Sequence, residues 1–215
     1  MRAAFLLAII GVIGSAMTAS ATEEPPHSVV LDDGQFQIRS YEPAIVAEVE
    51  VTGDMRRAGN SGFRPLADFI FGNNTAQNDI EMTAPVTRQP AASQKIVMTA
   101  PVTRVESADD VWTVTFFMPD EWTMETLPQP NNPEIKIREI PSEMIATIRF
   151  SGRGRERTHA EKQVLLEAWI TEQGYRAVGP ARYAGYNAPF VPGPLRRNEV
   201  MIPVEKINEG IDESS

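Results

Sequence analysis

The chain has 215 residues, no cysteine and a formal charge of −9 from 20 basic and 29 acidic side chains. The lack of cysteine excludes disulfides, a thiol nucleophile and lipid attachment to a processed N-terminal cysteine. The acidity argues against nucleic acids and anionic membrane surfaces as partners, because both attract basic proteins.

The first 21 residues have the pattern of a secretory signal peptide. Arg2 precedes an apolar stretch from Ala3 to Met17, and Ala19-Ser20-Ala21 supplies the small residues of a cleavage site. The apolar stretch is shorter than the roughly 20 residues that span a bilayer, which favours cleavage over an uncleaved membrane anchor. We therefore expect a periplasmic or secreted protein without stable membrane insertion, with a leader over residues 22–34.

The segment after the leader predicts two strands and a helix. Residues 35–40 and 44–52 form a hairpin candidate, because the second run alternates apolar and polar side chains. Residues 63–71 then place apolar side chains at i, i+3, i+4 and i+7, which is one face of a helix that ends at Gly72.

A nine-residue segment occurs twice, at residues 80–88 and 96–104, with eight of nine positions identical. The alternation places isoleucine, methionine, alanine and valine on one side of each copy, so each copy predicts a strand with one buried face. The short separation predicts that the copies pair antiparallel. Met82 and Met98 are interpreted as sheet core rather than as iron ligands.

The second part of the chain repeats the pattern of the first. After a strand at 111–118 and a proline-rich connection at 119–133, residues 138–152 align without gaps with residues 39–53. A helix over about 158–172 and strands near 181–186 and 198–205 follow, before an acidic tail at 206–215. The sequence therefore predicts an α+β fold, a distorted antiparallel β-barrel of two pseudo-repeated ββαββ-like halves, about 35–118 and 134–205, with a helix packed on each.

The motifs together resemble the SOUL haem-binding protein family over about residues 29–205, and we take 35–205 as the SOUL-like domain. They are the doubled I-x-M-T-A-P-V, Gly72-Asn73-Asn74-Thr75, Tyr183-Ala184-Gly185-Tyr186-Asn187 and Arg196-Arg197-Asn198-Glu199-Val200. The resemblance implies a distorted barrel that binds haem or another tetrapyrrole. It also implies a distant likeness to small-molecule effector domains of bacterial regulators, whose ligands lie in a cleft. The repeat alone leaves open whether the two halves enclose a cleft or pack without one.

A tetrapyrrole needs a flat apolar slot and cationic partners for its propionates. Phe63, Phe69 and Phe190 are the candidates for the slot, with Phe69 placed off the core stripe of its helix. Arg64, Arg196 and Arg197 are the candidates for propionate pairing, because a guanidinium binds a carboxylate with two hydrogen bonds.

His159 is the candidate axial ligand of a haem iron. Helical periodicity places it with Leu166 and Ile170 on the face opposite Val164, Leu165, Ala168 and Trp169, which we take as the core face. A solvated residue in the first helical turn is the alternative interpretation. His27, in the leader, is interpreted as an unliganded tail residue.

Two departures from the family pattern remove positive charge from the expected ligand rim. This chain has Asp68 and Phe69 where the mammalian members place ligand-contacting residues, including basic ones, and Phe190 and Val191 where they carry a lysine. A flat apolar molecule other than haem therefore remains an alternative ligand.

The sequence contains no motif of nucleophilic, zinc-dependent or dinucleotide-dependent enzymes. We therefore expect an exported binding protein that buffers or carries its tetrapyrrole without chemistry. The alternatives are a small-molecule hydrolase that uses the cleft between the repeats, and a protein-interaction module that uses the helix face around His159.

Overall fold

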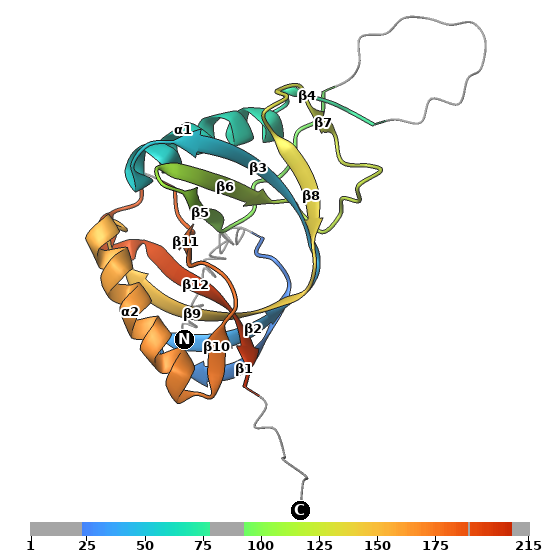
Figure 1. Cartoon of the computed structure of the whole chain (residues 1–215). Coiled ribbons are helices and arrows are strands. Elements are labelled where there is room, and N and C mark those ends of the chain that lie inside the picture. The colour runs from blue at the N-terminus through green and yellow to red at the C-terminus, as the bar shows by residue number, and fades with distance from the viewer. Residues whose placement is uncertain (1–22, 78–92, 189, 208–215) are drawn as a thin grey trace, which may run out of the picture.

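A computed structural model describes residues 23–77, 93–188 and 190–207. In this part of the chain, ten strands form one strongly curled antiparallel sheet, and two α-helices pack on its outer face (Figure 1). The elements are β1 (His27–Asp33), β2 (Phe36–Tyr41), β3 (Ala44–Thr52), α1 (Met55–Ile70), β4 (Asn74–Thr75), β5 (Val102–Ala108), β6 (Val111–Phe117), β7 (Gln129–Pro130), β8 (Lys136–Ile140), β9 (Glu143–Ser151), α2 (Glu156–Glu172), β10 (Tyr175–Ala177), β11 (Arg182–Gly185), the short 3₁₀ helix η1 (Gly193–Leu195) and β12 (Arg197–Lys206).

The sheet order confirms the predicted repeat. The strands run β1-β2-β9-β12-β11-β5-β6-β3-β8, with β10 added beside β12, while β4 and β7 form a separate small pair. The path is symmetric about the contact between β11 and β5, and each half contributes two strands, a helix and two further strands. The result is the α+β distorted barrel that the sequence predicts.

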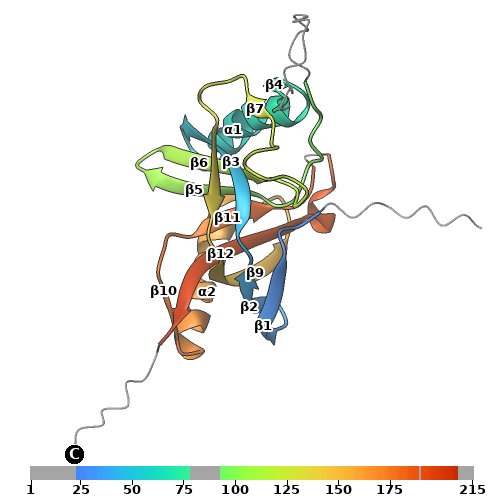
Figure 2. The ribbon, with the colours of Figure 1, turned by 90° about the vertical axis from the view of Figure 1, so that its right-hand side faces the viewer.

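The predicted hairpin between residues 35–40 and 44–52 is wrong, although both strands exist. β2 pairs with β1 and β9, and β3 pairs with β6 and β8. The first strand of each half thus joins the second strand of the other half, and Figure 2 shows β2 in the lower part of the molecule beside β9. This exchange links the halves through backbone hydrogen bonds, which local alternation does not reveal.

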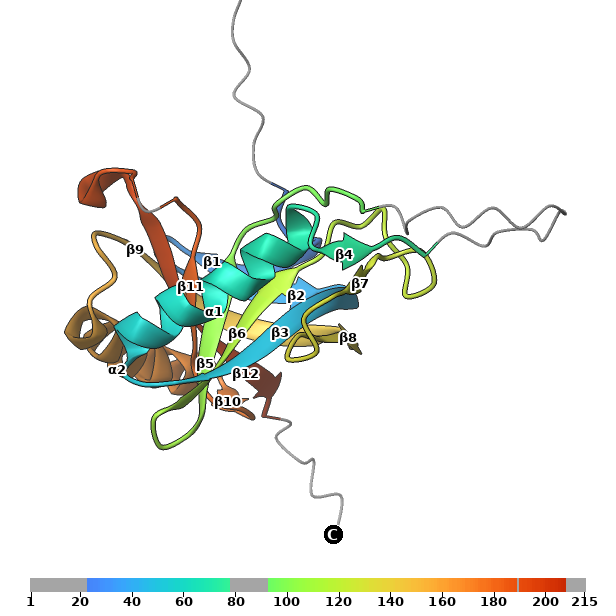
Figure 3. The same cartoon turned by 90° about the horizontal axis from the view of Figure 1, so that it is seen from above.

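Helix α1 begins eight residues before the predicted start. Asp54 caps it by accepting a hydrogen bond from the backbone N–H of Arg57 at 2.9 Å. The helix lies across β3 and β6 (Figure 3), and a buried cluster that includes Leu66, Phe69 and Ile70 fills the interface. Phe69 is 1% exposed, so its predicted place off the core stripe is wrong.

Helix α2 buries the face that the sequence interpretation left outside. His159, Leu166 and Ile170 are almost completely buried against the sheet, whereas Val164 and Leu165 are exposed. The sequence of α2 has two apolar stripes, and either one fits the core face of a helix. In the fold, the stripe with Leu166 and Ile170 packs against β9 and β12. The alternative of a protein-interaction module that uses the helix face around His159 is therefore wrong, because that face is in the core.

The doubled segment is only partly a strand. Its second copy joins the sheet at Val102, whereas residues 96–101 are not in a strand. The whole first copy, including Met82, lies outside the described residues, and so does the expected pairing of the two copies. Ile96 is buried and Met98 packs against the same cluster as α1, as expected for core residues.

The segment taken as a leader contains β1, whose hairpin with β2 turns at Gly34. His27 begins this strand, and its ring lies 4.8 Å from that of Tyr41. The interpretation of His27 as a residue of a loose tail is therefore wrong.

Gly62 sets how closely α1 approaches the sheet, and this gives a first prediction. A methyl group at Gly62 would lie 2.4 Å from Cγ2 of Val114. We expect Gly62→Ala to lower the free energy of unfolding by about 1–3 kcal/mol through overpacking, although alanine favours helix by about 1 kcal/mol over glycine. Urea denaturation measures the change.

Gly59→Ala is the matched control in the same helix. Its methyl group would meet the end of the flexible Arg104 side chain rather than the sheet. It should cost much less stability than Gly62→Ala, and equal losses would contradict the packing described here.

Candidate functional site

A cleft of about 710 Å³ opens on the outer face of the sheet, between the N-terminal ends of α1 and α2. This volume lies within the usual range for small-molecule sites. Its walls come from the first turns of both helices, from β5 and from the segment between β11 and β12. The cleft follows from the topology, because β5 and β11 pair at the centre of the sheet and the helices cover the strands to either side.

Residues from both halves meet on the floor of this region. Arg104 on β5 lies opposite Tyr183 on β11 in the strand register. The ring of Tyr183 is 5.0 Å from that of His159 on α2 and 6.1 Å from that of Trp112 on β6. Gly59 of α1 leaves room for the Arg104 guanidinium, since a methyl group there would lie 2.6 Å from Nη1.

Three polar atoms around Tyr183 are buried and have no hydrogen-bond partner among the described residues. They are Arg104 Nε, Trp112 Nε1 and His159 Nε2. Buried polar groups are nearly always hydrogen-bonded, and each one left without a partner costs about 1–3 kcal/mol. Arg104 also forms no ion pair with the described part of the chain, so an anionic ligand group could satisfy it.

The lining of the cleft is strongly cationic. It contains one acidic side chain, Glu156, and six arginines: Arg56, Arg104, Arg153, Arg155, Arg196 and Arg197. The N-terminus of α2 adds partial positive charge, since Arg155 at the cap position makes no side-chain capping bond. The cleft therefore favours anions, although the whole chain is acidic.

Burial makes His159 a neutral residue near pH 7. Burial and the nearby charge of Arg104 lower its pKa from 6.5 to about 4, against a smaller opposing effect of the Arg155 backbone. Nδ1 lies 3.2 Å from the Arg155 carbonyl oxygen and donates to it, which leaves Nε2 with a free lone pair. Because Nε2 is buried, an iron atom in the cleft could reach it only if its neighbours moved.

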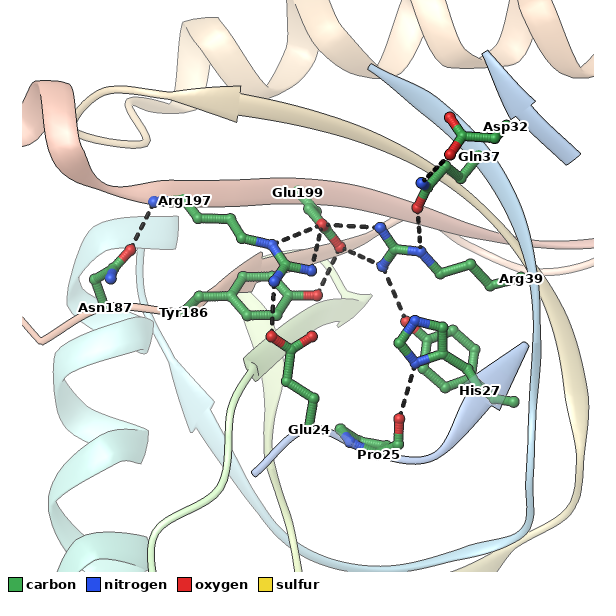
Figure 4. Close-up of polar contacts among 11 residues, drawn as sticks. Glu24, Pro25, His27, Asp32, Gln37, Arg39, Tyr186, Asn187, Arg197 and Glu199 are labelled. Atoms are coloured by element: carbon green, nitrogen blue, oxygen red, sulfur yellow. Dashed lines mark hydrogen bonds and ion pairs between the residues drawn. The ribbon is translucent and has the colours of Figure 1, made fainter. Parts of the chain in front are cut away.

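A buried ion-pair network fixes the wall of the cleft next to β12 (Figure 4). The Glu199 carboxylate is fully buried and accepts two hydrogen bonds from Arg39 at 2.9 and 3.1 Å. It also accepts from Arg197 Nε at 3.0 Å and from the Tyr186 hydroxyl at 2.6 Å. Arg197 further contacts Glu24 at 2.7 Å and lies over the ring of Tyr186.

The ionisation of Glu199 follows from these contacts. Burial alone would raise the pKa of Glu199, but hydrogen bonds and charges from Arg39, Tyr186 and Arg197 outweigh it and lower the pKa. Burial beside this carboxylate raises the pKa of Tyr186 well above its usual value. Glu199 therefore stays charged and holds two strands and the β11–β12 connection in place.

The structure brings together only some of the predicted site residues. Arg196 and Arg197 line the cleft, and His159 lies just beneath it, with Cε1 3.1 Å from the position of a methyl group on the cleft residue Gly154. Arg64 is exposed and lies outside the lining. Part of the predicted cationic set is thus in place.

The predicted apolar slot does not form. Phe69 is in the core, and Phe63 packs edge-on against Phe116 with ring centres 5.3 Å apart. Phe190 is 86% exposed and does not line the cleft. Phe63 and Phe69 thus belong to one core cluster beneath α1, and Phe190 lies apart from it in solvent.

The sequence interpretation missed Arg104, Trp112 and Tyr183. Arg104 is the last residue of the doubled segment, and Tyr183 begins a motif that was used only to recognise the family. A largely buried arginine within a strand is unusual unless it is paired, and this signal could have identified Arg104. Its contact with Tyr183 depends on the pairing of β5 with β11, which the sequence did not predict.

Within the described residues, no cluster of three histidine or acidic side chains could hold a metal ion. No helix of this part is long and apolar enough to cross a membrane.

Comparisons with known proteins identify the family. Residues 22–203 match the sequence profile described as SOUL heme-binding protein. The chain belongs to the SOUL haem-binding protein family. The human protein named Heme-binding protein 2 is 28% identical over 193 residues, which cover 86% of this chain and 87% of the relative. The mouse protein of the same name is 27% identical, with 77% of this chain and 76% of the relative covered.

A solved structure supports the fold at a greater distance. The EcmrR C-terminal domain superposes with a TM-score of 0.57 at 15% identity, covering 80% of this chain and 98% of that domain. SOUL membership and this likeness agree with the curled sheet and its two outer helices.

Removal of the Glu199 charge should destabilise the fold strongly. Glu199→Gln leaves Arg39 buried without its anion, and we expect a loss of about 3–5 kcal/mol in the free energy of unfolding at neutral pH. Glu161→Gln breaks an exposed pair with Arg157 and should cost less than about 1 kcal/mol. Similar losses in urea denaturation would contradict the role of the network.

The same network predicts an acid limit to stability. The folded-state pKa of Glu199 lies below its ordinary value of 4.5, so its stabilisation is complete above that pH and is lost as pH falls through the folded pKa. The free energy of unfolding of the wild type, measured by urea denaturation, should fall as the pH drops below 4.5. Glu199→Gln should lack the part of this fall that comes from protonation of Glu199.

His159 should act in a higher pH window. In the unfolded chain the imidazole becomes protonated near pH 6.5, whereas in the folded protein it stays neutral down to a pKa of about 4. The free energy of unfolding should therefore fall as the pH drops from 6.5 to about 4. The loss is of order 3 kcal/mol. His159→Gln should lack this slope in urea denaturation, and an unchanged slope would contradict the buried neutral state.

Proposed function

We propose that this protein is an exported tetrapyrrole-binding protein that holds its ligand in the arginine-lined cleft by the ligand's carboxylates and performs no chemistry on it. The observation that carries the proposal is Arg104, a largely enclosed cation with an unsatisfied Nε and no ion-pair partner among the described residues. SOUL family membership and the haem-binding names of the relatives supply the ligand class.

The residues of the cleft fit the acidic part of a tetrapyrrole. Two propionates need cationic donors at different points, and Arg104 on the floor and Arg153 and Arg155 on the rim are separate sources of guanidinium groups. The flat macrocycle could lie against the partly exposed Tyr186 and the aliphatic stems of the arginines.

The chain's own residues would bind and orient the ligand. Arg104 holds one carboxylate, the rim arginines hold the other, and the Glu199 network keeps Tyr186 and Arg197 in place. A bound haem would contribute redox-active iron. His159 offers a neutral imidazole beneath the cleft, but its enclosure argues against a preformed axial bond.

Export rests on the N-terminal pattern. Arg2, the apolar stretch and Ala19-Ser20-Ala21 have the features of a cleaved signal. A periplasmic or secreted carrier would meet free tetrapyrroles outside the cytoplasm.

Hemin titration tests this function directly. The purified protein should give a Soret change that saturates at one equivalent, and Arg104→Met should weaken binding by about tenfold or more, since hydrogen bonds to charged groups contribute about 1.5–3 kcal/mol. Protoporphyrin dimethyl ester should bind more weakly than protoporphyrin, because it lacks the carboxylates.

Arg157→Met is the control, because Arg157 is 90% exposed in its side chain and lies outside the cleft lining. No saturable Soret change at micromolar protein would overturn the function. Equal binding by Arg104→Met and the wild type would overturn the placement of the carboxylate.

A further inference from the structure

A second surface adjoins the cleft on the connection between β11 and β12. Phe190 is 86% exposed and Leu195 is 73% exposed. Both are large apolar side chains on a loop, and at this exposure they contribute little to the stability of the fold. We call Phe190 and Leu195 together the apolar tip.

Two arginines contact the loop that carries the apolar tip. Gly193 packs against Arg153, since a methyl group at Gly193 would lie 3.1 Å from Cγ of that arginine. Arg196 donates to the Val191 carbonyl oxygen at 2.7 Å and so fixes the loop. The exposed Arg153 and Arg155 lie nearby at the rim of the cleft. Apolar and cationic side chains thus share one face of an acidic protein.

The N-terminal segment enters the fold at this same face. Glu24 contacts Arg197 at 2.7 Å, and Arg197 helps to line both the cleft and the neighbouring hollow that contains Leu195. The first described residues thus lie next to the connection that carries the apolar tip.

We propose that the apolar tip and the arginines around it form a peripheral docking surface for an anionic lipid bilayer. The apolar tip enters the interface between headgroups and acyl chains, and the arginines pair with lipid phosphates. The binding is reversible, because two side chains and a few charges do not equal a spanning helix. Arg153 and Arg155 belong to both sites, so the apolar tip is the part of this surface that does not depend on ligand binding in the cleft.

The net acidity of the chain does not oppose this docking. Attraction to a membrane depends on charges within about a Debye length of the surface, which is about 8 Å at physiological ionic strength. The cleft and loop contribute arginines there, with Glu156 as the acidic side chain of the lining. The prediction against an anionic membrane was based on the total charge of the chain. The total charge does not show that arginines gather on one face.

Site-specific labelling tests the proposal, because the chain has no native cysteine. Phe190→Cys and Leu195→Cys are each labelled with a polarity-sensitive dye and mixed with vesicles of equal phosphatidylcholine and phosphatidylglycerol. The dye emission should shift to the blue at both positions and return at high salt. Val164→Cys is the matched control, because Val164 is also an exposed apolar residue, on the outer face of α2.

Vesicle co-sedimentation gives an independent measurement. The double variant Phe190→Ser, Leu195→Ser should partition at least tenfold less than the wild type, whereas Val164→Ser, Leu165→Ser should not differ from it. All four side chains are exposed, so neither pair removes core packing.

Three outcomes would overturn the proposal. They are no blue shift with anionic vesicles, an equal shift at Val164→Cys, and a shift that appears without vesicles as protein concentration rises. The last result would assign the apolar tip to contact between two copies of the chain.

Discussion

The buried contact between Arg39 and Glu199 is the constraint on which the cleft wall depends. It joins β2 of the first half to β12 of the second half, with β9 between them in the sheet. Because the carboxylate also accepts from Arg197 and Tyr186, the connection after β11 is fixed by the same anion. A buried charge network of this kind specifies one arrangement, since any shift leaves an uncompensated charge.

The exchanged strand pairing explains why the open site lies at the centre of the molecule. Each helix covers the strands of its own half, and the two hydrophobic clusters beneath α1 and α2 are separate. Arg104 and Tyr183 face each other where the halves meet, on the two central strands. A duplicated unit therefore produces a shared site to which both halves contribute, together with a cationic end formed by both helix starts.

Much of the fold could be predicted from the sequence, because alternation and helical spacing are local properties. The gapless match of residues 39–53 with 138–152 correctly identified the repeat. Pairing and burial are not local: the same alternation fits β2 beside β3 or beside β9, and α2 carries two apolar stripes. A sequence motif identified Arg196 and Arg197, whereas the places of Arg104 and Trp112 around Tyr183 followed only from the strand order.

The central claim is that Arg104, whose Nε has no hydrogen-bond partner among the described residues, holds a ligand carboxylate between the two helices. A crystal structure of the protein with hemin tests it most directly. We predict a propionate oxygen within hydrogen-bonding distance of Arg104, with the macrocycle between the starts of α1 and α2. A well-ordered hemin bound elsewhere, with Arg104 free of it, would contradict this claim.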